Sequence, residues 1–330
     1  MMRPKMKLCA AAVALGVLSM GASAQEKLYV YTSMKDSITN ELKKGFAKKH
    51  PEVKLDFQVA GAGKLMAKLA AERESGKILA DILWTSEVPD FYQLKSRGQL
   101  LPYMPAEIKS LIQPLADYDG SFTAVRLGTL GVVYNTKKIK EAPKSWDDLK
   151  KPEYKGAYGI ANPALSGTAY MSVALLAQTF GWEYFEALRA NGAKMGKGSG
   201  QVVDDTASGD LVAALGVDYI VLDKIDKGAT LGFAFPKEML VLPSPIAIMK
   251  GTPNEVAAKK FVDYVLSKDG QQVIADEGTI PVRTDVKSPE RFKLPAADEA
   301  MKRAIKIDYS KVMNEKEPTV KKFTDIMQKK

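Results

Sequence analysis

Two long extended runs, far apart in the chain, constrain the fold more than any other feature of this sequence. The first covers residues 122–139, and the second covers residues 237–251 with Pro243 and Pro245 near its middle. Proline inside a strand is typical of an edge or a crossover, because it donates no ladder hydrogen bond. A further section of strands and helices lies between the runs. The pattern predicts a chain that crosses from one lobe to another and later returns.

The rest of the chain alternates short apolar strands with amphipathic helices. Before the first extended run, strand-like and helix-like patterns pair at 27–33 with 36–50, 53–60 with 63–76, and 80–87 with 88–100. Such alternation is typical of parallel βαβ units in an α/β layered domain. We therefore predict an α/β fold of two lobes joined by two extended crossover strands, with the ligand in the cleft between the lobes.

The crossings also set the predicted boundaries. Residues 25–127 and 243–288 are expected to form lobe one, and residues 128–242 and 289–330 lobe two. Hinges absorb backbone rotation in a few residues between rigid units. We expect these hinges near Leu127–Gly131 and Leu242–Pro245.

Residues 1–24 have the features of a secretory signal peptide. Three basic residues precede an apolar stretch that ends in Ala22-Ser23-Ala24, a small-residue cleavage site. A membrane anchor is the alternative, but the stretch is shorter than the roughly 20 residues that a bilayer span needs. The sequence predicts export and a mature chain that begins at Gln25. The only cysteine, Cys9, lies in the leader, so no disulfide is expected to hold the mature fold.

Composition narrows the possible chemistry. The formal net charge is +9, but no long basic run with interleaved aromatic residues occurs, so we expect no nucleic-acid partner. His50 is the only histidine, and the mature chain has no cysteine, so a His/Cys zinc cluster cannot form. Ser–His and Cys–His nucleophilic catalysis lack parts for the same reason. We therefore expect no catalytic residue, no cofactor and no metal site.

The segment 162–180 contains the strongest candidate for a binding site. Ser166, Gly167 and Thr168 stand at the start of an apolar helical run, where the first-turn amides have no partner within the helix. One interpretation is an ordinary N-cap, in which a hydroxyl accepts from those amides. The other is an anion site, in which a phosphate or carboxylate takes the amides instead. The segment alone leaves both open.

Other candidates follow strand-like runs, because ligands in open α/β sheets bind beyond the carboxyl ends of the strands. These loops are rich in glycine and in small hydroxyl residues, which let backbone amides approach an anion closely. The loops that meet this description lie at 32–36, 60–64, 85–87, 198–200 and 217–219.

Several segments then resemble a known family. LYVYTS, ADILWTSEVPDFYQLKSRGQL, NPALSGTAY, SGDLVAALGVDY, KKFVDYVLSKDGQQ and GTIPVR occur in this order. With them the chain is similar to periplasmic solute-binding proteins of ABC importers, of the type II two-lobe architecture. Within these it resembles the branch that contains ferric-iron, phosphonate, sugar-phosphate and thiamine binders. The resemblance implies a monomeric periplasmic protein that captures a small solute for an inner-membrane ABC permease.

The resemblance also implies roles for the candidate residues. The helix-start Ser-Gly-X pattern, which maps onto Ser166, Gly167 and Thr168, binds a phosphate group in related members. Ser199 and Lys64 map onto further polar contacts to the anion. The remaining solute is expected to contact Ser33, Thr85, Ser86, Glu87, Asp218 and Tyr219. We predict a small anionic phosphoryl-bearing solute, either a sugar phosphate or an aminoalkyl phosphonate, whose hydroxyl or ammonium groups suit the two carboxylates.

Ferric iron is the alternative within the same branch. Iron-binding members typically use adjacent tyrosines where this chain has Tyr219 followed by Ile220, and Lys35 stands where some carry a histidine. The acidic ligand expected in the next loop is missing from GAGKL. A ferric ion needs several anionic oxygen donors, and a nearby lysine opposes it. We therefore predict against tight iron binding, and an organic carboxylate remains a further alternative. A secreted phosphate-ester hydrolase is the alternative from another class, although no histidine base or metal cluster is evident for it.

Overall fold

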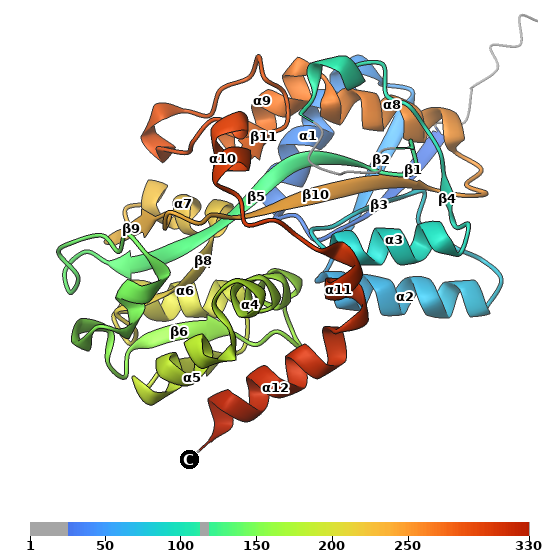
Figure 1. Cartoon of the computed structure of the whole chain (residues 1–330). Coiled ribbons are helices and arrows are strands. Elements are labelled where there is room, and N and C mark those ends of the chain that lie inside the picture. The colour runs from blue at the N-terminus through green and yellow to red at the C-terminus, as the bar shows by residue number, and fades with distance from the viewer. Residues whose placement is uncertain (1–25, 113–118, 330) are drawn as a thin grey trace, which may run out of the picture.

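The protein is described by a computed structural model that covers residues 26–112 and 119–329. The expected leader, residues 1–24, and the expected mature start at Gln25 lie outside the described residues. The model is a two-lobe α/β molecule, with helices on the faces of a twisted sheet (Figure 1). None of the helices in the described ranges combines the length and apolar character that a bilayer crossing demands.

The described residues form one continuous sheet of eleven strands. The neighbours along it are β2-β1-β3-β10-β5-β8-β6-β7, with β11 and β9 also paired to β5 and β4 paired to β10. The strands are β1 Glu26–Thr32, β2 Val53–Val59, β3 Ile82–Trp84, β4 Leu100–Leu101, β5 Thr123–Asn135, β6 Tyr158–Ala161, β7 Lys194–Gly196, β8 Ala213–Val217, β9 Leu231–Ala234, β10 Leu240–Met249 and β11 Ile280–Pro281.

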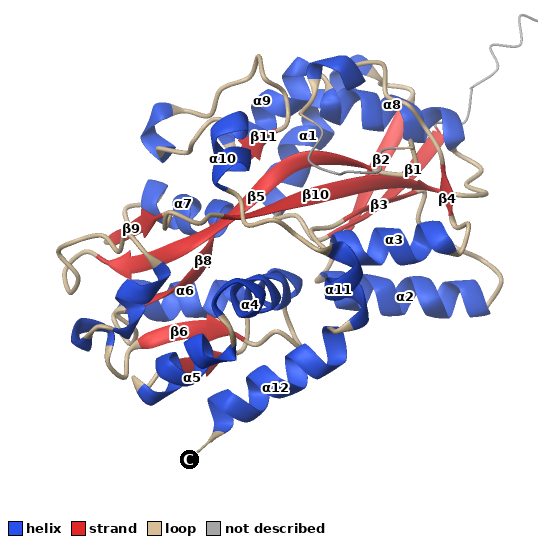
Figure 2. Cartoon of the chain, in the orientation of Figure 1, coloured by secondary structure: helices blue, strands red, loops and turns tan. Residues whose placement is uncertain are grey.

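Helices alternate with these strands and cover both faces of the sheet (Figure 2). They are α1 Asp36–Lys49, α2 Ala62–Glu74, α3 Val88–Ser96, α4 Gly167–Phe180, α5 Trp182–Ala190, α6 Ser199–Ser208, α7 Asp218–Asp226, α8 Glu255–Leu266, α9 Lys268–Asp276, α10 Ala297–Arg303, α11 Tyr309–Asn314 and α12 Lys316–Gln328. The strand–helix alternation expected over residues 27–100 is confirmed element by element.

β5 and β10 are the two crossing strands that the sequence predicts. They pair antiparallel with each other, from Leu240 opposite Leu130 to Ile246 opposite Thr123. One end of β10 pairs with β3, and the far end of β5 pairs with β8, so the pair continues the sheet from one lobe into the other. The ladder shifts register between Ser244 and Pro245. The two prolines thus lie in a crossover strand with an irregular ladder, and the predicted fold class is confirmed.

Each lobe has its own apolar core. In lobe one, β1 and β3 pack against α1 and α8, and the core includes Trp84 and Phe261, both fully buried. Lobe two has a core on each face of its sheet, one under α4, α5 and α12 and the other under α6 and α7. A chain of this length can build cores of this size without disulfides.

The segment 289–330, which we assigned to lobe two, is divided between the cores. Ala297 and Ala300 of α10 pack in the core of lobe one, whereas Phe323 and Ile326 of α12 pack in lobe two. The backbone of Arg303 accepts a hydrogen bond from Met239 N, just before β10. The C-terminal segment therefore passes beside the crossing strands, and its last helix joins the second lobe.

Candidate functional site

A cavity of about 240 Å³ lies between the two lobes, at the beginnings of five helices. Its lining comes from Ser33 after β1, Gly61 and Ala62 at α2, Ser86 and Glu87 before α3, Leu165 to Thr168 at α4, Gly198 and Ser199 at α6, and Tyr219 and Ile220 at α7. The first amides of a helix have no partner within it and carry the positive end of its dipole. Their convergence makes this cavity favourable for a negative group.

Three hydroxyl groups from two of these helices form a cluster in the cavity. Ser166 Oγ lies 3.0 Å from both Thr168 Oγ1 and Ser199 Oγ, and the last two oxygens are 3.2 Å apart. Ser166 is also the N-cap of α4, and its Oγ accepts from Ala169 N at 3.3 Å. The geometry is therefore that of a cap. Each hydroxyl still has one proton, which can turn from its neighbour to a shared acceptor.

A buried carboxylate faces the same helix start. Glu87 is 4% exposed, and its Oε2 accepts from Nζ of Lys316, the first residue of α12, at 3.0 Å. A Cβ atom on Gly167 would lie 1.8 Å from Glu87 Oε1, so only glycine fits this close approach. Burial and the Glu87 charge raise the pKa of nearby Asp90 to about 7, although Lys316 opposes this shift.

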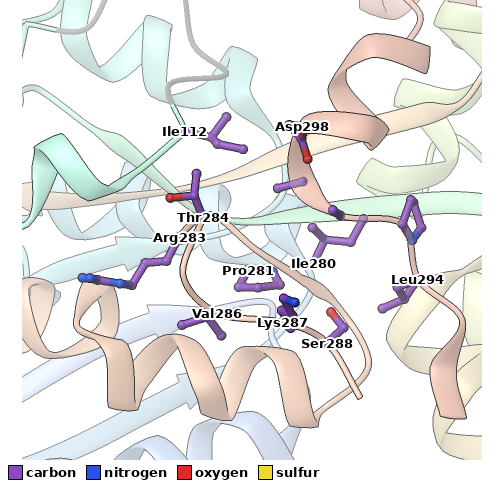
Figure 3. A pocket seen from close by; sticks show the side chains of 13 residues that line it. Ile112, Ile280, Pro281, Arg283, Thr284, Val286, Lys287, Ser288, Leu294 and Asp298 are labelled. Carbon is purple, nitrogen blue, oxygen red and sulfur yellow. The ribbon is translucent and has the colours of Figure 1, made fainter. Parts of the chain in front are cut away.

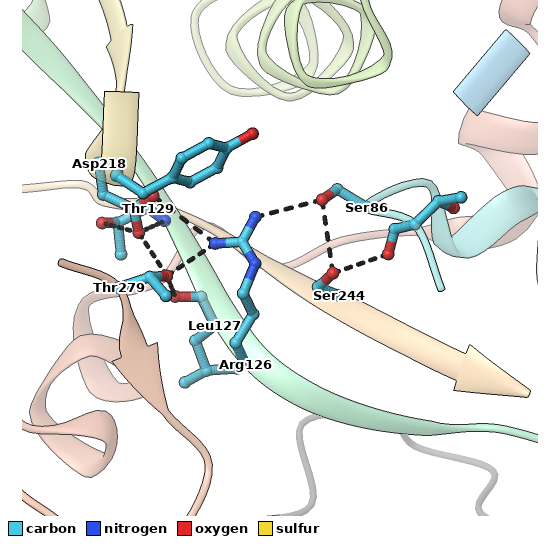
Figure 4. A network of polar contacts seen from close by, with 9 residues as sticks. Ser86, Arg126, Leu127, Thr129, Asp218, Ser244 and Thr279 are labelled. Carbon is cyan, nitrogen blue, oxygen red and sulfur yellow. Dashed lines mark hydrogen bonds and ion pairs between the residues drawn. The ribbon is translucent and has the colours of Figure 1, made fainter. Parts of the chain in front are cut away.

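A buried arginine that the sequence analysis missed contacts two residues of the cavity wall, Ser86 and Tyr219. Arg126 of β5 is 1% exposed, and it donates to Ser86 Oγ at 3.2 Å and to Thr279 Oγ1 at 2.7 Å (Figure 4). Its guanidinium carbon lies 4.9 Å from the centroid of the Tyr219 ring. The sequence did contain a signal for Arg126, because a charged residue inside an otherwise apolar strand must be paired where it is buried.

Asp218 completes this network from the start of α7. Its Oδ2 accepts from Thr129 N at 2.8 Å and from Thr279 Oγ1 at 2.9 Å, and Arg126 Nη1 lies 3.6 Å from Oδ1 (Figure 4). Burial raises the pKa of this carboxyl, although Arg126 and the hydrogen bonds oppose the shift. These internal donors already satisfy the carboxylate that we expected to contact the solute.

The structure brings eight of the eleven predicted site residues to the cavity: Ser33, Ser86, Glu87, Ser166, Gly167, Thr168, Ser199 and Tyr219. Three lie elsewhere. Lys64 is exposed on α2, Thr85 is fully buried and its backbone carbonyl accepts from Ser244 Oγ, and Asp218 belongs to the network just described. Sequence spacing places a residue in a loop but not the direction of its side chain.

Among the further hollows of the described residues are two that differ in their relation to this cavity. One of about 490 Å³ shares Ser33, Gly61, Tyr219 and Ile220 with the interlobe cavity and extends it toward Lys35 and Asp223. The other, of about 480 Å³, lies between β11, the loop after it and the start of α10 (Figure 3). The second contains none of the predicted site residues.

Two α/β lobes joined by crossing strands, with a polar cavity between them built from helix starts, define a two-lobe solute-binding protein. The chain belongs to the family of bacterial extracellular solute-binding proteins, whose model matches residues 77–311. The resemblance to periplasmic solute-binding proteins, inferred above from short segments, is thereby confirmed.

Named relatives agree on the class and differ in the solute. A putative 2-aminoethylphosphonate-binding periplasmic protein of Salmonella typhimurium is 27% identical over 250 residues, 72% of each chain. The periplasmic binding protein AfuA from Actinobacillus pleuropneumoniae, solved with fructose 6-phosphate bound, superposes with a TM-score of 0.79. That match is 26% identical over 92% of this chain and 99% of AfuA. Iron-bound HitA from Pseudomonas aeruginosa shares the fold, with a TM-score of 0.77 and 23% identity over 91% and 99% of the chains.

Proposed function

We propose that this protein captures a small solute with a phosphoryl group in the periplasm and delivers it to an ABC permease. The hydroxyl cluster of Ser166, Thr168 and Ser199, at the merging starts of α4 and α6, supports this proposal most directly. The proposal extends to this chain the solutes named for the Salmonella relative and for AfuA, a phosphonate and a sugar phosphate. Monomeric state and export by a cleaved leader are part of the same proposal.

Binding follows from donors that converge on one place. The phosphoryl oxygens accept from the three hydroxyls and from first-turn amides of α4 and α6, which are charge-assisted bonds and about twice as strong as neutral ones. Ser86 offers a further donor, because its Oγ accepts from Arg126 and its proton can turn from Ser244 Oγ, 3.4 Å away, toward the cavity. The remainder of the solute extends past Tyr219 toward Lys35 and Asp223.

The surroundings of Tyr219 argue against ferric iron. Its ring centroid lies 4.9 Å from the Arg126 guanidinium carbon and 5.8 Å from Lys35 Nζ. Two cations beside the tyrosine oppose a trivalent metal ion, which needs anionic donors. Within residues 26–112 and 119–329, no three His, Cys, Asp or Glu side chains are grouped to hold a metal.

Calorimetry on the purified protein tests the proposal with 2-aminoethylphosphonate, fructose 6-phosphate, inorganic phosphate and ferric citrate. We expect one of the phosphoryl compounds to bind and ferric citrate to give no tyrosinate colour. Phosphate release from the ester, measured in the same samples, separates binding from hydrolysis. A tyrosinate colour with ferric citrate that disappears in Tyr219→Phe would instead identify ferric iron as the bound solute.

Variants then locate the anion. Ser166→Ala and Thr168→Ala should each weaken phosphoryl binding about tenfold or more, because a bond to a charged group is worth roughly 1.5–3 kcal/mol. Ser208→Ala, which removes an exposed hydroxyl at the far end of α6, is the matched control and should bind normally. If the first two variants kept full affinity and only melted earlier, the hydroxyls would be caps and not ligands.

A further inference from the structure

The Glu87 carboxylate adjoins the place proposed for the anion, and this imposes a condition on the solute. Glu87 Oε1 lies so close to Gly167 that a Cβ there would be 1.8 Å away. Gly167 stands between Ser166 and Thr168, so the carboxylate meets the same turn that carries two of the three clustered hydroxyls. A group held by these hydroxyls therefore lies beside Glu87 Oε1.

The charges around Glu87 leave this oxygen as an acceptor. Its Oε2 is engaged by Lys316 at 3.0 Å, whereas Oε1 lies against Gly167, which lines the cavity. Asp90, one turn along α3, places a second carboxyl near the same lysine, and its Oδ2 has no hydrogen-bond partner among the described residues. Because Asp90 is largely protonated below pH 7, Lys316 balances only the charge of Glu87. Glu87 has no surplus of positive charge that would let it tolerate a further anion at contact distance.

A solute group beside Glu87 Oε1 avoids repulsion if it presents a proton to this oxygen. An ionised carboxylate accepts hydrogen bonds and donates none. A fully ionised tetrahedral anion would set its oxygens against Oε1, and like charges at this separation in a buried site repel strongly. A phosphate or phosphonate, whose second pKa is about 6, still has a singly protonated fraction at mildly acidic to neutral pH, and that fraction can donate a hydrogen bond. A sulfate or sulfonate of the same shape has none to give.

We propose that Glu87 is a specificity residue that accepts a hydrogen bond from a singly protonated phosphoryl group. The protein then selects phosphates and phosphonates against sulfates and sulfonates. This inference rests on the function proposed above and adds the protonation state of the bound group. The proton belongs to the phosphoryl group itself, because Oε1 meets the Ser166–Thr168 turn and not the more distant hollow toward Lys35 and Asp223.

Calorimetry at pH 6.5 on the full mature protein tests the role of Glu87 with two pairs of compounds of nearly the same shape. The first pair is 2-aminoethylphosphonate and 2-aminoethylsulfonate, which share chain and ammonium and differ in the acid group. The second pair is inorganic phosphate and sulfate, which tests the head group alone. In each pair that binds to the wild type, we expect the phosphorus compound to bind more tightly than the sulfur compound by a factor of about 100 or more. The sulfur compound would set an oxygen against Glu87 Oε1 with no proton between them, and an unsatisfied buried acceptor is costly.

Glu87→Gln should remove this selectivity, because the amide NH₂ can donate to a sulfur oxyanion. We expect its preference for phosphorus over sulfur to fall below about tenfold, with a melting temperature close to that of the wild type. Glu299→Gln, which changes an exposed carboxylate on α10, is the control and should keep the wild-type ratio. The wild-type comparison alone tests the idea even if Glu87→Gln folds poorly.

The outcomes separate the two proposals. Equal binding of phosphonate and sulfonate by the wild type would overturn the role of Glu87 and leave an anion-binding function in place. Tight binding of the sulfonate that Glu87→Gln abolishes would instead assign the carboxylate to the ammonium group. If the wild type bound none of the phosphorus compounds, the proposed function itself would be wrong, and the inference with it.

Discussion

At the scale of single residues, Asp90 is the group whose ionisation should be visible in the stability of the whole protein. It lies one turn into α3, and burial together with the Glu87 charge raises its pKa to about 7, while Lys316 opposes the shift. A carboxyl in the unfolded chain titrates near pH 4. Between about pH 4 and pH 7 the folded protein therefore holds a proton that the unfolded chain has lost.

Linkage gives the sign of the effect. Where the folded state binds more protons, stability falls as the pH rises, by about 1.4 kcal/mol per pH unit for one proton. The contribution of Asp90 is complete below pH 4 and is lost as the pH passes 7. Asp90→Asn keeps a neutral group of the same shape. We expect it to melt above the wild type by a gap that widens as the pH rises from 5 to 7 and is at least ~2 °C at pH 8.

Thermal scans of both proteins at pH 5, 6, 7 and 8 measure this difference. Asp298→Asn, an exposed carboxylate at the start of α10, is the control and should show no such trend. A gap that stayed constant with pH would mean that Asp90 is ionised throughout the range, as an ordinary surface carboxylate is.

At the scale of elements, the link between β5 and α7 is the feature to test. Arg126 and Asp218 are both buried, and each also has hydroxyl partners on neighbouring segments. Removing one member of a buried pair leaves an uncompensated charge, which costs about 3–5 kcal/mol. We expect Arg126→Met to lose this much stability, and Arg126→Met with Asp218→Asn to lose less than the sum of the two single changes.

A double-mutant cycle in urea measures this coupling, because contacting residues give non-additive effects. Additive losses would show that β5 and α7 are held by packing alone. The affinity of the same variants for solute reports on function. Because Arg126 donates to Ser86, the arginine variant should also lose affinity, whereas Thr136→Ala, just after β5, should keep it.

The elements themselves were predictable to a large extent, and their side-chain directions were not. The strands and helices of lobe one follow from apolar periodicity, and the crossing strands follow from two extended runs of unusual length. Arg126 was missed because it is a single charge inside an apolar run. Its partners Ser86 and Thr279 are 40 and 153 residues away in the sequence. Lys64 shows the reverse case, because its place in the loop before α2 does not fix the face of the helix on which it lies, and the structure has it exposed.

At the scale of the whole molecule, side chains of the two lobes meet across the cavity. Glu87 before α3 pairs with Lys316 of α12, and Lys35 before α1 lies 3.7 Å from Asp223 of α7. The crossing strands and the segment from α10 to α12 are the covalent links between the lobes, and the register shift at Ser244 and Pro245 interrupts the ladder of the crossing strands. A solute that fills the cavity adds contacts to both lobes and so favours the arrangement in which they touch.

Small-angle scattering tests this closure. We expect the radius of gyration of the mature protein to fall when a saturating concentration of the solute identified by calorimetry is added. Without solute, Lys316→Met should have a larger radius than the wild type, because the closed form loses its pair with Glu87 and leaves that carboxylate buried without its cation. Lys321→Met, which removes an exposed lysine from the same helix, should match the wild type. Equal radii with and without solute, in a sample that calorimetry shows to be fully bound, would mean that the lobes do not move about β5 and β10. Release to the permease would then require another route out of the cavity.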